Sequence, residues 1–217
     1  MKKKQNTTKL VMLSILAALV IVFTYIPIKF GTFQLNLALI FIAVGAIMYG
    51  PIAGALLGLI NGGVVLLNGD AALFLGWNLV GTIITVLLKT ALAGFVVGIA
   101  YKLLSKINKN VAIITSALLA PVVNTLVFII GCLIFFVNPI SAMASESGKN
   151  ILSVILVGFI GVNFFFEFFI NVLLSPTITR VIEYGMRNNK EIKDEEVVED
   201  VKVPDFEIVD ATLDDKE

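Results

Sequence analysis

Two ionisable side chains, Lys89 and Glu167, stand deep inside long apolar stretches of the sequence. A charge at the centre of a bilayer costs at least about 2.5–3.5 kcal/mol, so such a group usually faces a partner or a water-filled cavity. At about 1.5 Å per helical residue, they lie roughly 18 Å and 25 Å from the outer ends of their helices. Long side chains and helix tilt can bridge this offset. Two interpretations stay open: a structural ion pair, or a ligand site in which Lys89 faces an anionic group.

Amide side chains occur at similar depths. Asn124 and Asn163 lie in the middle of two apolar stretches, and Asn78 lies nearer the end of another. Asn163 precedes Glu167 by four residues, so the two share one helix face. Asparagine in a membrane helix often only hydrogen-bonds a neighbouring helix. Polar groups from three stretches at similar depth nevertheless favour one shared pocket.

Three further candidates, Gln34, Asp70 and Trp77, fall at the expected outer end of the molecule. Trp77 suits the aromatic belt at a membrane surface. Alternatively, the loops that carry these residues form a lid over an outward-facing pocket. We therefore include all three among the candidate substrate-binding residues.

Several classes of chemistry find no support in the sequence. The chain has no histidine and a single cysteine, Cys132, so it offers no Ser-His pair, few zinc ligands and no intrachain disulfide. It also lacks the Gly-rich loop with Lys-Ser/Thr of P-loop ATPases. We expect no enzymatic activity, no bound metal, no cofactor and no nucleic-acid partner.

The elements that position these residues are long and apolar. The chain is 58% hydrophobic, with a mean hydropathy of +0.98. A helix needs about 20 apolar residues to cross a bilayer, and backbone groups in lipid must be satisfied internally. These features predict an all-α integral membrane protein, a bundle of six transmembrane helices. The expected helices are Lys9–Ile26, Leu35–Tyr49, Pro51–Leu67, Trp77–Leu104, Val111–Val137 and Asn150–Tyr184, with polar loops at Lys29–Gln34 and Asn138–Lys149.

The charges divide the chain into two parts. The segment after Asn189 has twelve acidic residues and four lysines, whereas the rest has twelve Lys and Arg and four acidic residues. We expect residues 1–187 to form the transmembrane domain and residues 188–217 a disordered acidic cytoplasmic tail. With six spans, ten basic residues fall on one side and two on the other. The positive-inside rule then places both termini in the cytoplasm.

One segment resembles a known family. Leu35–Ile60, with its Gly50-Pro51 turn followed by Gly54 and Gly58, is similar to the second and third helices of the substrate-binding S components of energy-coupling factor (ECF) transporters. In the first stretch, Ser14 and Ala18 are four residues apart and share a face with small side chains. From the residues alone, this face could pack inside the chain or meet a partner. With Ala17, it matches the Ala-rich motif by which such subunits contact the transmembrane coupling protein.

The resemblance implies a multi-pass subunit of the bacterial cytoplasmic membrane that captures a small water-soluble vitamin outside and delivers it inward. ATP would be used only by two cytoplasmic ATPase subunits, which drive the coupling protein. The resemblance also implies substrate-binding roles for Lys89, Asn124, Asn163 and Glu167, with Asp70 and Trp77 near the lid. A buried lysine and amides suit a small carboxylate vitamin, pantothenate first, with riboflavin or another vitamin as alternatives.

Two other functions remain open at this stage. An autonomous secondary carrier or facilitator of a small solute would need no ATPase, so uptake would persist without a partner. A structural membrane protein would use Lys89 only as a member of an ion pair.

Overall fold

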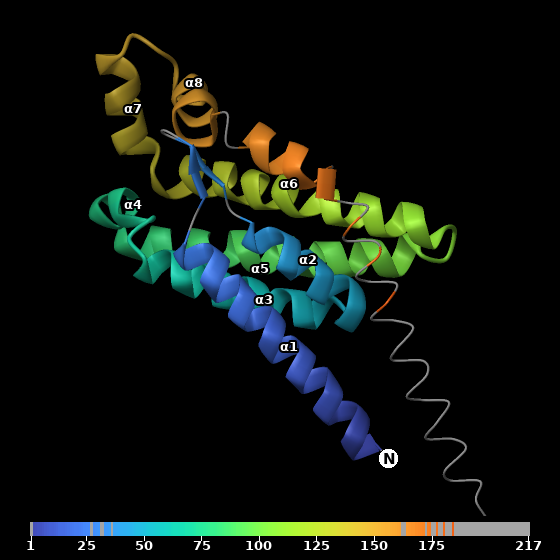
Figure 1. Cartoon of the computed structure of the whole chain (residues 1–217). Coiled ribbons are helices and arrows are strands. Elements are labelled where there is room, and N and C mark those ends of the chain that lie inside the picture. Colours follow the sequence, from blue (N-terminus) through green and yellow to red (C-terminus); the bar gives the residue numbers. More distant parts are fainter. Residues whose placement is uncertain are drawn as a thin grey trace, which may run out of the picture.

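The computed structural model describes residues 2–26, 28–30, 33–35, 37–161 and 164–171, and residues 173, 174, 177, 180 and 184. Asn163 and the acidic tail from residue 188 onward lie outside the described residues. The described chain is mainly helical (Figure 1). The elements are α1 (Lys2–Tyr25), β1 (Ile28–Phe30), β2 (Phe33–Leu35), α2 (Ala38–Tyr49), α3 (Pro51–Leu67), α4 (Ala72–Trp77), α5 (Leu79–Leu104), α6 (Lys109–Phe135), α7 (Val137–Glu146), α8 (Ile151–Ser153) and the π-helical turn η1 (Val154–Ile160). Residues 164–171 are also helical.

Two segments that we expected to be loops are ordered. The segment after α1 forms a short antiparallel hairpin in which Lys29 of β1 pairs with Gln34 of β2. The expected loop Asn138–Lys149 is mostly helix α7, because Ile140 and Ala144 are four residues apart and both are buried. This spacing gives α7 one apolar face despite its polar composition.

One expected helix begins later than predicted, and another is interrupted. Asn78 adopts an extended backbone and separates α4 from α5, so the helix predicted from Trp77 to Leu104 is a single helix that begins at Leu79. The helix predicted from Asn150 to Tyr184 breaks at Gly161, whose φ of 47° ends the preceding π-helical turn. A positive φ is readily adopted only by glycine, so Gly161 permits a break that most other residues would oppose.

The number of membrane crossings is only partly settled. Among the described residues, three helices are long and apolar enough to cross a bilayer: Thr7–Tyr25 of α1, α5 and α6. A fourth crossing is present if Val137–Glu146 and Ile151–Ile160, which meet at 98°, form one broken span. Helices α2 and α3 are apolar but shorter. The six-span count therefore stays a prediction.

Small residues bring α3 and α5 into backbone contact. A Cβ added to Gly54 would lie 2.8 Å from the carbonyl carbon of Gly94, and one added to Gly98 would lie 2.5 Å from Cα of Pro51. Such close approach replaces the hydrophobic driving force that helices lack in lipid. Gly54 therefore packs within the bundle, and the same contacts hold α5 in place.

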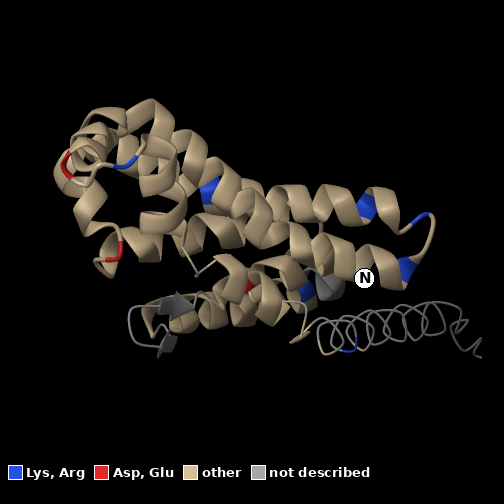
Figure 2. Ribbon diagram, turned by 90° about the horizontal axis from the view of Figure 1, so that it is seen from above, with Lys and Arg blue, Asp and Glu red and all other residues tan. Residues whose placement is uncertain are grey.

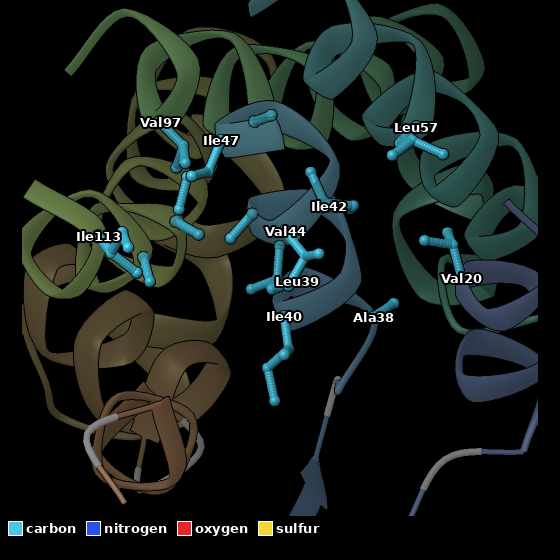
Figure 3. Close-up of a cluster of buried hydrophobic side chains, with 14 residues drawn as sticks. Val20, Ala38, Leu39, Ile40, Ile42, Val44, Ile47, Leu57, Val97 and Ile113 are labelled. Atoms are coloured by element: carbon cyan, nitrogen blue, oxygen red, sulfur yellow. The ribbon is translucent and has the colours of Figure 1, made fainter. Parts of the chain in front are cut away.

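The largest buried cluster surrounds α2. Leu39 and Ile42 of α2 are fully buried, with Val20 of α1, Val97 of α5 and Ile113 of α6 beside them (Figure 3). A helix that is apolar on every side belongs in the interior of a protein or a membrane. Helix α2, although short, is therefore the centre about which the longer helices pack.

The two ends of the molecule differ in charge. The N-terminus and the turn between α5 and α6 lie toward one end, whereas α4, α7 and α8 lie at the other (Figure 1). Lysines gather around the α5–α6 turn, at Lys102, Lys106 and Lys109 (Figure 2). The positive-inside rule predicts that such an end faces the cytoplasm, and the orientation stays a prediction.

Candidate functional site

A cavity of about 250 Å³ lies among α4, α5, α6 and η1. Its wall combines one lysine, two carboxylates, an asparagine, three threonines and five phenylalanines. Ligand pockets in proteins are typically about 300–1,000 Å³, apolar for the most part and supplied with a few polar groups. This cavity is somewhat smaller and more polar, since polar and apolar surface line it in nearly equal shares, and its volume suits a small polar ligand.

Lys89 provides the positive charge in the cavity. Its Nζ lies 5.2 Å from the centroid of the Phe128 ring on α6, which is a cation–π distance. The carboxylates of Glu167 and Asp70 act on the same ammonium group electrostatically. The structure thus brings Lys89 and Glu167 to one cavity, as their depths predicted. Both the ion-pair and the ligand-site interpretations are compatible with this geometry.

Asn124 and three threonines supply the neutral polar groups. Asn124 and Thr125 come from α6, and Thr82 and Thr85 come from α5. Among the described residues, Asn124 Oδ1 and Thr85 Oγ1 are buried without a hydrogen-bond partner. A buried oxygen without a partner costs about 1–3 kcal/mol, so it indicates a place where an absent molecule can bind.

An aromatic cluster forms the apolar wall. The ring of Phe74 on α4 lies 5.1–5.4 Å from the rings of Trp77, Phe128, Phe136 and Phe159, in edge-to-face arrangements. Such pairs stabilise beyond their buried area by about 0.5–1.5 kcal/mol each. Trp77 contacts Phe74 but does not line the cavity, so it supports the wall from behind.

Asp70 closes the cavity near the turn between α3 and α4. Its exposed carboxylate accepts a hydrogen bond of 2.7 Å from Asn68 Nδ2, and Asn68 Oδ1 accepts one of 3.0 Å from the Asp70 backbone N–H. Asn68 Nδ2 also donates to the backbone oxygen of Thr24 at 3.1 Å. One amide therefore connects the cavity carboxylate to the last turn of α1.

The remaining predicted residues are not brought to the cavity by the described structure. Asn78 caps α5, since its side-chain oxygen accepts a 2.9 Å hydrogen bond from the Gly81 N–H. Asn at this position is a common helix N-cap, and the apolar run that follows it was the signal for that role. The side chain of Gln34 and the whole of Asn163 lie outside the described residues.

Sequence reasoning missed part of the wall. It did not select Phe74, Phe136 or Phe159, because a phenylalanine in an apolar stretch carries no distinguishing signal. It also missed Thr82 and Thr85, since a threonine in a membrane helix usually satisfies its hydroxyl within its own helix. Thr85 is distinguished only by having no hydrogen-bond partner in the part of the chain that the structure describes.

The predicted coupling face is accessible on α1. Ser14 and Ala18 are exposed, and the Ser14 hydroxyl donates only within its helix, to the Leu10 oxygen at 2.9 Å. Ala17 is half-buried against the cluster around α2. The two outer residues thus present small side chains at the surface. Among the described residues, no group of three His, Cys, Asp or Glu side chains could hold a metal ion.

Comparison with known proteins assigns the family. Residues 8–179 match the family described as "ECF transporter, substrate-specific component", which covers most of the chain. No curated protein and no solved structure shows significant similarity to the chain. The structure is consistent with this match, because it has membrane-length helices and a cavity between helices within the matched range. The chain belongs to the family of substrate-specific components of ECF transporters.

Proposed function

We propose that the cavity binds a small water-soluble carboxylate vitamin, with pantothenate as the first candidate. The observation that carries this proposal is the ammonium group of Lys89 inside a cavity of an ECF substrate-specific component. A cation held within the bundle is costly unless a negative group compensates it. Glu167 lines the same cavity and acts on Lys89 electrostatically, and the carboxylate of a ligand would add a further negative group.

The other cavity groups suit the rest of such a molecule. Asp70, Glu167 and Asn124 offer oxygen acceptors, which match the hydroxyl and amide N–H groups of pantothenate. The phenylalanine side chains suit its apolar carbons. The cavity carries two carboxylates against one ammonium group, so a ligand with a carboxylate alone would meet net repulsion. Hydrogen-bond donors on the ligand are therefore part of the proposal.

Riboflavin is a second candidate because five phenylalanines line the cavity: Phe74, Phe128, Phe136, Phe159 and Phe164. Aromatic walls favour flat rings, which stack or meet them edge to face. The hydroxyl groups of its ribityl chain would reach the same acceptors. Competition between the two vitamins for the purified protein distinguishes these candidates.

Transport requires partners that the chain does not contain. We propose that the α1 face with Ser14 and Ala18 docks on the transmembrane coupling protein, and that two cytoplasmic ATPases supply the energy. The exposure of both residues supports this role. The host membrane is then the bacterial cytoplasmic membrane, with the lysine-rich α5–α6 turn inside.

A vitamin panel tests the proposal. A ligand that binds only the folded state at about 100 Kd adds about 2.7 kcal/mol to its stability. We expect pantothenate, or one other vitamin, to raise the melting temperature of the detergent-purified wild type and to have much less effect on Lys89→Ala. If no vitamin shifts the wild type, the vitamin proposal is wrong.

Uptake by cells distinguishes an ATPase-dependent subunit from an autonomous carrier. Cells that produce the chain with the coupling protein and ATPases should accumulate the vitamin, and cells that lack the ATPases should not. Uptake that persists without the ATPases would establish an autonomous carrier instead.

A further inference from the structure

One hydroxyl in the cavity wall departs from the pattern of its own helix. Three buried threonines lie on α5. The hydroxyl of Thr82 donates to the Asn78 oxygen at 2.7 Å, and that of Thr90 donates to the Val86 oxygen at 3.0 Å. The Thr85 hydroxyl has no partner among the described residues. Because threonine in a helix normally makes this bond to the preceding turn, Thr85 keeps its donor and acceptor available.

The opposite helix leaves room for this side chain. A Cβ placed on Gly131 of α6 would lie only 2.5 Å from Thr85 Oγ1. Any side chain at this position would therefore collide with Thr85 and displace it. Gly131 thus acts as a positioning residue, which lets α6 pack beside Thr85 without displacing it from the cavity wall.

Thr85 is placed to act together with the charged group of the cavity. Lys89 follows it by four residues on α5, so the two share a helix face about 5–6 Å apart at Cβ. Asn124 faces the same cavity from α6, and its Oδ1 is also buried without a described partner. Two buried oxygens without a described partner therefore belong to residues that line the same cavity as Lys89.

We infer that Thr85 is a specificity-determining residue, which hydrogen-bonds a hydroxyl or amide group of the ligand whose anionic group binds Lys89. The inference rests on the proposed function, because it assigns the same cavity to substrate. A site built around unpaired hydrogen-bonding groups rejects analogues that lack the matching group, since its polar atoms then stay unsatisfied. The cavity therefore selects carboxylates that also carry hydroxyl or amide groups over carboxylates without them.

The experiment uses the full-length, detergent-purified chain and the variants Thr85→Val, Thr85→Ser, Gly131→Ala and Thr90→Val. Valine keeps the shape of threonine and removes the hydroxyl. Thr90→Val is the matched control, because that hydroxyl is satisfied within α5 and Thr90 does not line the cavity. Pantothenate, riboflavin and nicotinate serve as probes, the last being a carboxylate without hydroxyl or amide groups.

Binding and ligand-free stability are both measured. For the probe that binds wild type most tightly, Thr85→Val should weaken binding about 3- to 10-fold, and Thr85→Ser and Thr90→Val less than 2-fold. The preference for that probe over nicotinate should fall by the same factor. Gly131→Ala should also weaken binding. Equal affinities of Thr85→Val and wild type would overturn the inference.

The melting temperature without ligand tests this inference independently of the proposed function. Replacing a buried hydroxyl that makes no hydrogen bond by a methyl group is neutral or stabilising, whereas replacing a hydroxyl that makes one loses that bond and is not stabilising. Without ligand, Thr85→Val should melt about 2–4 °C above wild type, and Thr90→Val should not. If no probe binds wild type, the vitamin proposal fails while this result still decides the state of the Thr85 hydroxyl. A melting temperature of Thr85→Val below that of wild type would overturn the inference independently of any ligand.

Discussion

The contact between α3 and α5 can be tested by adding one methyl group at Gly58. A Cβ there would lie 2.6 Å from the carbonyl carbon of Thr90 and 2.8 Å from Cα of Ala91. Both are backbone atoms of a helix, so neither can rotate away. The Thr90 carbonyl oxygen would lie closer still. Ordinary contact begins at 3.4 Å, so Gly58→Ala must separate the two helices locally by more than the difference between 2.6 and 3.4 Å.

The expected cost follows from overpacking. Inserting a methyl group into a tight contact costs about 1–3 kcal/mol. Alanine recovers about 0.5–1 kcal/mol of helix propensity, which leaves a net loss of up to about 2.5 kcal/mol. For a chain of this size, that lowers the melting temperature by up to about 10 °C. Thr90 adjoins Lys89, so vitamin affinity should also fall.

The assay compares Gly58→Ala with Gly63→Ala by thermal unfolding in detergent at one heating rate. Gly63 lies on the same helix, and a Cβ added there would meet nothing within 4 Å. Helix propensity alone then acts, and the melting temperature should rise by about 1–4 °C. If Gly58→Ala melts at or above Gly63→Ala, the close approach of α3 and α5 is refuted.

Three further predictions concern the rest of the fold. Thr24→Val should cost about 1–3 kcal/mol in thermal unfolding, because the Thr24 hydroxyl donates to the Val20 oxygen at 2.6 Å and its oxygen lies 2.6 Å from the buried side-chain amide of Asn61, which loses this partner; an unchanged melting temperature would contradict this. Phe74→Ala should lower the free energy of unfolding by at least about 2 kcal/mol, because four rings lose their common contact. A loss below about 0.5 kcal/mol, the contribution of a single weak ring pair, would show that the cluster does not stabilise the fold. Cysteines introduced at Lys106 and Glu146, in a background without the native cysteine, should react with an impermeant maleimide from opposite sides of the membrane. Labelling of both from one side would exclude the proposed orientation.

Much of the fold follows from local signals in the sequence. Helix α3 has the predicted bounds, since Pro51 suits the first turn of a helix and Asn68 follows its last residue. The breaks were harder to predict. The sequence around Gly161 is apolar on both sides, so only the backbone conformation of that glycine reveals the interruption.

The sequence predicted those cavity residues whose types are unusual in membrane helices. Lys89, Glu167 and Asn124 stood out because polar groups at that depth are costly, and the structure brings all three to one cavity. Trp77 stood out for its residue type, yet its ring packs behind Phe74. Thr85 did not stand out, because its distinguishing property is that its hydroxyl has no hydrogen-bond partner among the described residues. This property depends on tertiary packing, which the sequence does not show.

The most direct test of the cavity as the substrate site is the dissociation constant of the vitamin that stabilises the wild type, measured by calorimetric titration of wild type, Lys89→Met and Lys149→Met. Methionine keeps an unbranched side chain and removes the charge, and Lys149 is a matched lysine outside the cavity. Hydrogen bonds to charged groups contribute about 1.5–3 kcal/mol, so Lys89→Met should weaken binding by at least about 10-fold, while Lys149→Met binds like the wild type. Binding by Lys89→Met at the wild-type dissociation constant would contradict the account.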